Sequence, residues 1–492
     1  MTTAWRCAPQ SPGFLILSAG VLMCGCDSDG EGEICGNGTC GAGENVANCP
    51  ADCEQTSSTG GTGGAAGAGG TAGGGGTGGG TGGGGGGAIP GELGGSCGAD
   101  QPCGPGLLCG SDNLCQLDPA LDYAAFFDQA WNDSGTYGGR NVTDGHANES
   151  CPCDQSIYYF YWDYAGLVDA WRATGQKSYL DEALGYAYVY KDKSSVITNS
   201  GGTFYGWPAD SGETAGIVLW EAYGFRPIFT LLRVMHGSPN LLATAHGQDE
   251  FPGTTYQDVL DDLFPWFKVN FFDKWEADGI GNHYRSRVHM ASHSARIALD
   301  IYLINGESKY LQYFQNIAHL GFPGGTSYPG DSWRNNLNNS PSSTTYVWNA
   351  TWDIDVNNNN GDSVQDQSHG SDPISFAVEA FEAGHHFTQA DIDAFSNTLL
   401  NNVWVDNGSD PYVGFNEFVD GSDTASTTLE YEGRFMGGWG TLARYNDAAW
   451  ARVCSEVTSV DRIWLNLRGY TFGTLAYAQA VQNRTVAYPE NF

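Results

Sequence analysis

A tract made almost wholly of glycine, alanine and threonine, from Thr59 to Ile89, sets the first limit on how this chain can fold. Such a tract has almost no apolar side chain to bury and behaves as a flexible coil. A single core cannot extend across it, so the chain divides into parts on either side. We predict a disordered linker over residues 59–91 and one large domain over residues 119–492.

Two clusters of cysteines flank this linker, in the segments 27–58 and 92–118. Each cluster places four cysteines among many glycines and few apolar residues: Cys35, Cys40, Cys49 and Cys53 in the first, and Cys97, Cys103, Cys109 and Cys115 in the second. Even cysteine counts in an exported segment without a core indicate disulfide bonds. Zinc is the competing interpretation, but neither cluster contains a histidine or a C-x-x-C pair.

Residues 1–26 have the pattern of an export signal. Arg6 precedes an apolar run, Phe14 to Met23, that is too short to span a bilayer. The run ends in LMCGC, which resembles a bacterial lipobox, although Met23 and Cys24 depart from its usual residues. We expect a lipoprotein at the cell surface or outer membrane, with a cleaved signal and secretion as the alternative. No other apolar run approaches the ~20 residues of a spanning helix, so the lipid is the only membrane contact expected.

Acidic residues greatly outnumber basic ones, and the net charge is −35. Eleven acidic residues and one basic residue precede Pro119, so 45 acidic and 20 basic residues remain in the large domain, a balance of −25. This balance argues against nucleic acid or an anionic membrane surface as a partner.

The large domain contains a repeated helical pattern. In the segments that begin at Tyr158 and His293, apolar residues recur at helical spacing until a glycine, Gly175 or Gly306. Glycine supplies a left-handed helix end, and a Tyr-Leu pair four residues later opens a second helix. The motif G-x-x-x-Y-L therefore predicts an antiparallel helical hairpin, used twice.

A third hairpin is predicted from Asp372, as the N-cap of a helix with Pro373 in its first turn. This helix would end at Gly384, and Thr388 with Asp391 has the pattern of a capping box for the next helix. Further helices are expected over 217–235, 256–275 and 435–443, and strand signals are confined to 344–352. We predict an all-α fold, an α/α toroid built as an incomplete barrel of helical hairpins and expected to be monomeric. An α-solenoid binding protein is the alternative.

Polar residues are densest between Asn282 and His293. His289 and His293 are four residues apart and share one face of a helix. Three interpretations compete. The histidines could cap helix ends or bond to carbonyl groups. H-x-x-x-H also has the spacing of zinc ligands, but Met290 replaces the glutamate of H-E-x-x-H, so we expect no metal there.

The third interpretation is acid–base chemistry on a uronic acid. Proton removal next to a carboxylate needs a cation or amide that neutralises the carboxylate, a base, and an acid that protonates the leaving oxygen. The segment supplies these groups. The candidate catalytic residues here are Asn282, Tyr284, Arg287, His289 and His293, and the candidate substrate-binding residues are His283 and Arg285.

A second polar cluster, from Asp366 to Asp372, adds His369 as a catalytic candidate. Asp366 could orient His369 or accept a hydrogen bond from substrate, and a solvated loop is the alternative. Trp207, Tyr431 and Arg434 are further candidate substrate-binding residues.

The stretch from Asp353 to Asp362 approaches a calcium-binding loop, but its glycine is one residue late for an EF-hand. A structural Ca²⁺ and a polar loop both remain open there.

Three runs carry a family resemblance: KWEADGIGNHYRSRVHMASHSARIAL, INGESKYL and DQSHGSDPISFAVEAFEAG. They resemble the alginate-lyase-like α/α-toroid polysaccharide lyases, across residues 119–492. The resemblance implies β-elimination at a uronic acid of a polysaccharide such as alginate or glucuronan, with no required cofactor. Asn282, His283 and Tyr284 resemble the N-H-x-Y arrangement of alginate lyases, although the tyrosine here follows the histidine directly.

Two alternatives stay open. A toroid glycoside hydrolase would use two carboxylates across a cleft, and the candidates are Asp210, Glu213, Asp366 and Asp372. A non-catalytic surface glycan-binding protein would need only the aromatic residues.

Overall fold

The structure is a computed structural model of the chain. It describes residues 96–98, 103–104, 106–111, 113–118, 121–133, 139–148, 154–207, 218–339, 342–352, 364–405, 412–422, 436–463 and 467–488. All of them belong to one of two compact units of the chain, residues 62–492. The predicted signal segment, first cysteine cluster, glycine linker and calcium-like loop lie outside the described residues.

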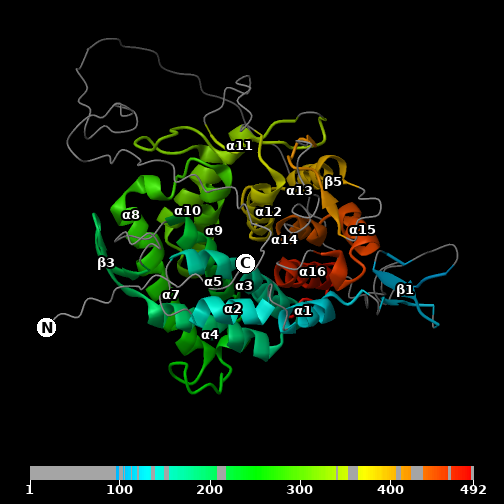
Figure 1. Ribbon diagram of the computed structural model, residues 1–492, viewed down its shortest axis with the longest axis horizontal. Coiled ribbons are helices and arrows are strands. Elements are labelled where there is room, and N and C mark those ends of the chain that lie inside the picture. Colours follow the sequence, from blue (N-terminus) through cyan, green and yellow to red (C-terminus); the bar gives the residue numbers. More distant parts are fainter. Residues whose placement is uncertain are drawn as a thin grey trace, which may run out of the picture. The chain divides into compact units, whose positions relative to one another are not determined.

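The described part is mostly helical, as predicted, and six of its helices pack against one another in closed succession. In order, α3 contacts α5, α5 contacts α9, α9 contacts α12, α12 contacts α14, α14 contacts α16, and α16 contacts α3. Figure 1 shows these six helices in the middle of the unit. Their bounds are α3 Asp154–Thr174, α5 Val218–His236, α9 Val288–Asn305, α12 Gln367–Glu382, α14 Met436–Gly440 and α16 Arg468–Gln482.

Other helices pack on the outside of these six. In four cases an outer helix follows its inner helix along the chain and contacts it: α4 on α3, α7 on α5, α10 on α9 and α13 on α12. Their bounds are α4 Lys177–Lys193, α7 Tyr256–Phe267, α10 Ser308–Gln315 and α13 Gln389–Thr398. The remaining helices are α1 Tyr123–Asn132, α2 Gly139–Asn148, α6 Pro239–Leu242, α8 Lys274–Asp278, α11 Trp333–Asn336 and α15 Asp447–Glu456.

The predicted hairpin turns are confirmed. The residues that follow α3, α9 and α12 include Gly175, Gly306 and Gly384, which have φ of +69°, +72° and +70°. A residue with a Cβ rarely adopts this left-handed conformation, so glycine ends each helix. The capping box of Thr388 and Asp391 at the start of α13 is also present.

The predicted start of the third hairpin is wrong. Helix α12 begins at Gln367 rather than after Asp372, because the Asp366 side chain accepts a hydrogen bond from the His369 N–H and caps the helix. Pro373 therefore lies inside the helix, and Asp372 turns its carboxylate toward buried partners on other helices.

Strands are few and short in the described part. The hairpins pair β1 (Leu107–Cys109) with β2 (Cys115–Leu117), β3 (Ser195–Asn199) with β4 (Gly202–Gly206), and β5 (Trp404–Val405) with β6 (Gly414–Phe415). All three are antiparallel. The β3–β4 hairpin was not expected, and the stretch 344–352 forms isolated bridges instead of strands.

The second cysteine cluster forms disulfides, as predicted. Cys97 is bonded to Cys109, and Cys103 to Cys115. None of the helices in the described part combines the length and apolar character that a bilayer crossing needs.

Candidate functional site

Two histidines from different helices lie against each other, with their ring planes tilted by 37°, where α9 and α12 begin. The rings of His289, in the first turn of α9, and His369, in the first turn of α12, have centroids 4.3 Å apart. Asp366, the cap of α12, holds the second ring, because its two oxygens lie 3.0 and 2.9 Å from His369 Nδ1. The side chains of His369 and Asp366 are 30% and 32% exposed, so this end of the site is open to solvent.

His293 lies one turn further along α9, among buried charges. Its Nδ1 is 3.0 Å from Nη1 of Arg226 on α5, and its Nε2 is 3.5 Å from an oxygen of Asp372 on α12. A guanidinium can only donate, so Nδ1 of His293 accepts and the imidazole proton lies on Nε2, toward Asp372. The same Arg226 Nη1 donates to Asp372 at 3.1 Å.

Three buried tyrosines surround this carboxylate. The Tyr223 hydroxyl donates to Asp372 at 2.8 Å, and the Tyr161 hydroxyl lies 3.4 Å from the other carboxylate oxygen. Tyr470 follows, with its hydroxyl 3.3 Å from that of Tyr161.

The buried tyrosines continue into an aromatic group that is less deeply buried. Together with Leu219 and Met290 they form a small apolar cluster, separate from the main core. The half-buried residues that pack against it are Tyr158, Trp162, Ala165 and Trp220. Rings of this kind are suited to stacking against sugars, so the polar site has an aromatic border.

Burial and nearby charges shift the pKa values of the two facing histidines in opposite directions. Burial, and then the charge of His369, holds the pKa of His289 well below its ordinary value. Burial alone would also lower the pKa of His369, but the charge and hydrogen bonds of Asp366 outweigh it and raise that pKa. His289 is therefore a neutral imidazole beside a ring that holds its proton more firmly, an arrangement typical of acid–base pairs.

Burial and nearby charges also set the pKa values of one more histidine and two carboxyl groups. Burial lowers the pKa of His293 to about 4, so this ring is neutral as well. Burial would raise the pKa of Asp372, but His293 and Arg226 hold it far below its usual range. His369 likewise keeps the pKa of Asp366 well below its ordinary value against the effect of burial. Both carboxyl groups are thus ionised.

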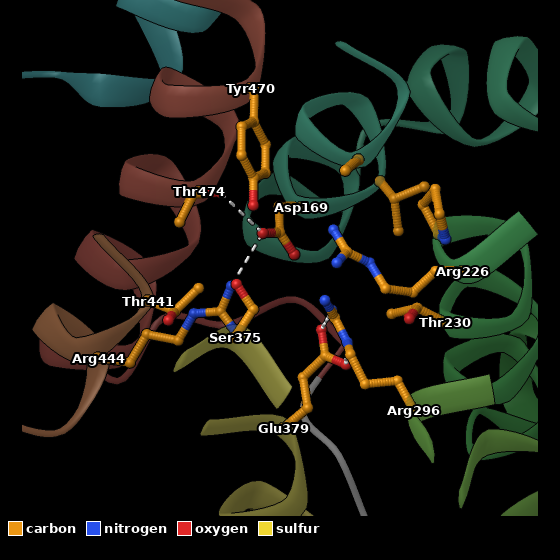
Figure 2. Close-up of a pocket in the computed structure, with 13 residues that line it drawn as sticks. Asp169, Arg226, Thr230, Arg296, Ser375, Glu379, Thr441, Arg444, Tyr470 and Thr474 are labelled. Atoms are coloured by element: carbon orange, nitrogen blue, oxygen red, sulfur yellow. Dashed lines mark hydrogen bonds and ion pairs between the residues drawn. The ribbon is translucent and has the colours of Figure 1, made fainter. Parts of the chain in front are cut away.

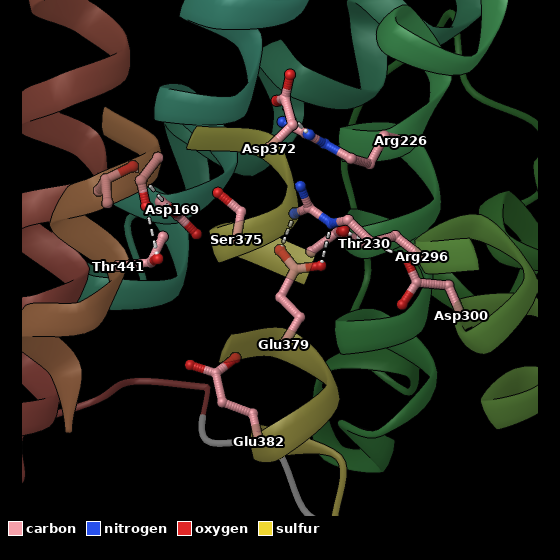
Figure 3. Close-up of polar contacts among 12 residues, drawn as sticks. Asp169, Arg226, Thr230, Arg296, Asp300, Asp372, Ser375, Glu379, Glu382 and Thr441 are labelled. Carbon is pink, nitrogen blue, oxygen red and sulfur yellow. Dashed lines mark hydrogen bonds and ion pairs between the residues drawn. The ribbon is translucent and has the colours of Figure 1, made fainter. Parts of the chain in front are cut away.

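Next to His293 lies a centre of buried ion pairs. In the described part of the chain five arginines are buried, and each pairs with a carboxylate. Figure 2 shows three of them, Arg226, Arg296 and Arg444, around a small cavity with Tyr470 beside it. Figure 3 shows Glu379 beside Arg296, and Asp372 beside Arg226. This centre ties together helices that lie far apart in the sequence.

The structure brings five of the predicted site residues together. His289, His293, His369 and Asp366 make the contacts described above, and the positive charge of Arg287 acts on His369 to lower its pKa. Arg287 is the half-buried N-cap residue of α9.

Other predicted residues have different partners. Asn282 donates to the Trp275 carbonyl at 3.2 Å. His283 stacks on Phe272 with centroids 3.9 Å apart, and its Nε2 lies 3.0 Å from the Phe272 carbonyl oxygen. The Tyr284 hydroxyl accepts from Asn316 at 2.8 Å.

Trp207 is fully buried in the main core, where it packs against Phe225. The Arg285 side chain is half-buried, and its backbone oxygen accepts a hydrogen bond from Trp352 at 2.6 Å. Tyr431, Arg434, Asp210 and Glu213 lie outside the described residues.

Sequence reasoning missed Arg226 and the tyrosines Tyr161, Tyr223 and Tyr470. One signal was present: Arg226 is a charged residue in the apolar run GFRPIF of a helix that is buried along most of its length. A buried charge needs a partner, so this arginine pointed to a carboxylate elsewhere in the chain.

The chain matches no protein-family model, and no curated protein matches its sequence.

Proposed function

We propose that this protein is an exported polysaccharide lyase of the α/α-toroid class, which cleaves a uronic-acid polymer by β-elimination. The observation that carries the proposal is the pair of facing imidazoles, the neutral His289 and the Asp366-supported His369. The buried tyrosines that contact His293, one turn along α9 from His289, and the half-buried aromatic rings packed on them add to it.

The proposed reaction divides among these groups. The neutral His289 takes the proton from the carbon next to the uronate carboxyl group. The electron pair left on that carbon forms a double bond, and the bond to the glycosidic oxygen breaks. Protonated His369 and Arg287 neutralise the uronate carboxylate, which makes the carbon acid strong enough for an imidazole base.

The leaving oxygen needs a proton, and we assign its donor to the tyrosine group around Asp372. The hydroxyls of Tyr161, Tyr223 and Tyr470 lie within one hydrogen-bonded group with this carboxylate. Tyr284 is a weaker choice for this role, because its hydroxyl is bonded to Asn316 and is not part of this group.

The two carboxylates beside the histidines, Asp366 and Asp372, favour a lyase over a hydrolase. A glycoside hydrolase needs one carboxylic acid with a raised pKa as its proton donor. At this site Asp366 and Asp372 both have lowered pKa values and stay ionised. Neither therefore suits the role of general acid.

The toroid fold and the surface location complete the proposal. A toroid of helical hairpins accounts for the closed succession of inner helices, each contacting the next, with outer helices that follow them along the chain. An N-terminal lipid and glycine-rich linker would hold this domain outside the cell, where polysaccharides are found.

The test is a screen of alginate, glucuronan, pectate and glycosaminoglycans for the ultraviolet absorbance of an unsaturated uronate product. The same screen measures new reducing ends and binding. We expect unsaturated product from at least one polymer. Reducing ends without that absorbance would show a hydrolase, and binding with neither would show a non-catalytic binder.

Two variants then test the site. We expect His289→Gln and His369→Gln each to lower the elimination rate by about 10²–10⁴-fold, the usual contribution of an acid–base group. His236→Gln is the matched control, because His236 is exposed at the end of α5. An unchanged rate in both site variants, with the fold intact by circular dichroism, would refute the assignment of roles.

A further inference from the structure

The small cavity among the buried arginines has a volume of about 20 Å³. Its lining includes Arg226 from α5, Arg296 from α9 and Arg444, which ends the 3-10 helix Thr441–Arg444. All three arginines are at least nine-tenths buried. Space of roughly 10–15 Å³ holds one water molecule, so the cavity has room for a small species such as a water molecule or a monatomic ion.

Each of the three arginines has a carboxylate partner yet keeps one polar atom unused. Arg226 pairs with Asp372 at 3.1 Å, and Arg444 with Asp169 at 2.8 Å. Arg296 donates through Nε to Glu379 at 2.6 Å. The buried nitrogens that remain without a hydrogen-bond partner are Nε of Arg226, Nη1 of Arg296 and Nε of Arg444. Figure 2 shows the guanidinium groups of Arg226 and Arg296 reaching into the same space.

Like charges meet across this space. Burial, and then the charge of Arg296, lowers the pKa of Arg226 to about 10. The carboxylates of Asp372 and Glu379 offset part of this repulsion. A further negative charge between the two guanidinium groups would offset more of it at close range, where the low local dielectric strengthens the interaction.

An anion fits these donors better than water does. A water molecule accepts two hydrogen bonds and must place its own two protons, whereas a halide accepts from several donors and donates none. The residues that line this space therefore carry three unused cationic N–H donors, more than the two hydrogen bonds that one water accepts. We propose that this cavity binds one halide ion, chloride in the physiological setting, which bridges α5, α9 and the 3-10 helix Thr441–Arg444. This proposal does not depend on the lyase function.

Two measurements test it. In crystals of the full chain grown with sodium bromide, we expect an anomalous-scattering peak in the cavity beside Arg226 and Arg296. In solution, the melting temperature should be a few degrees higher in sodium chloride than in sodium gluconate of equal ionic strength. Bromide peaks only at the surface, with equal melting temperatures in the two salts, would overturn the proposal in favour of water.

A matched pair of variants tests whether the effect of chloride on the melting temperature comes from this cavity. Arg296→Gln removes one of the cationic donors, so its melting temperature should no longer respond to chloride. Arg334→Gln is the control, since Arg334 pairs with Asp391 and does not line the cavity. It should keep the full chloride response, and loss of the response in both variants would contradict the site. If Arg296→Gln fails to fold, the bromide map of the unaltered protein decides.

Discussion

Replacing Asp366 with asparagine tests the electrostatic basis of the site without removing its structural cap. Asparagine caps helices about as well as aspartate, so α12 should keep its start. The change removes the charged hydrogen bond to His369. Such bonds contribute roughly 1.5–3 kcal/mol when buried. Both side chains are about one-third exposed, and solvent screening reduces the contribution to about 1 kcal/mol.

The directions of the pKa shifts of Asp366 and His369 give the pH range in which Asp366→Asn loses stability. The lowered pKa of Asp366 gives stability that is present above its ordinary value of 3.8 and is lost as the pH falls. The raised pKa of His369 gives stability that is present below its ordinary value of 6.5 and is lost as the pH rises through the folded value. The difference in free energy of unfolding between the unaltered protein and Asp366→Asn should therefore be largest between the two ordinary pKa values, 3.8 and 6.5.

The most direct assay is an NMR titration of selectively labelled histidines. A loss of about 1 kcal/mol lowers the proton affinity of His369 roughly fivefold, so its titration should move to lower pH in Asp366→Asn. Asp258→Asn is the control, because Asp258 belongs to the capping box of α7 and should leave His369 unchanged. If His369 titrates at the same pH in the unaltered protein and in Asp366→Asn, the proposed support of the imidazolium is refuted.

Three further changes test other parts of the structure. Lys274→Met should lower the free energy of unfolding in urea by about 3–5 kcal/mol, because it leaves the fully buried Glu221 carboxylate without its charge partner. Adding Glu221→Gln should restore part of that loss, and an additive double variant would contradict the pairing. Gly473→Ala should lower the free energy of unfolding by about 1–3 kcal/mol or more, because its Cβ would lie 2.0 Å from a backbone oxygen of α3. Gly185→Ala is the control: its Cβ would have no neighbour within 4 Å, so this change should raise the free energy of unfolding slightly. Trp162→Ala should weaken polysaccharide binding by about 0.5–1.5 kcal/mol in calorimetry if its ring stacks on sugar, and unchanged affinity would exclude that contact.

Local features of the fold could be predicted from the sequence. The turns at Gly175, Gly306 and Gly384 depend on one glycine and its immediate neighbours, and the disulfides on cysteine spacing. The capping box before α13 likewise involves residues three positions apart. Each signal acts within a few residues, so no tertiary contact was needed to find it.

Features set by tertiary partners could not be predicted. Asp372 has the local pattern of a cap before a proline, but its charge partner Arg226 lies 146 residues away in the sequence. His283 and Tyr284 stand in a motif-like run, yet the Phe272 carbonyl and Asn316 hold them in other contacts. In each case the side chain bonds to a group that is distant in the sequence and not to the partner that the local pattern suggests. A single sequence does not show which distant groups come into contact.

The large domain carries a net negative charge, so binding of a polyanionic substrate depends on the cationic groups at the site. The five buried arginines, Arg172, Arg226, Arg233, Arg296 and Arg444, are paired with buried carboxylates, so they add little net positive charge to the site. Among the described residues, the cationic groups at its open end include Arg287 and, when protonated, His369. If the substrate is a uronate polymer, its carboxylate would meet Arg287 and a second cation that exists only while His369 is protonated. Binding would then raise the pKa of His369 further, by linkage, so recognition of the uronate and the charge state of the two histidines would be one coupled equilibrium.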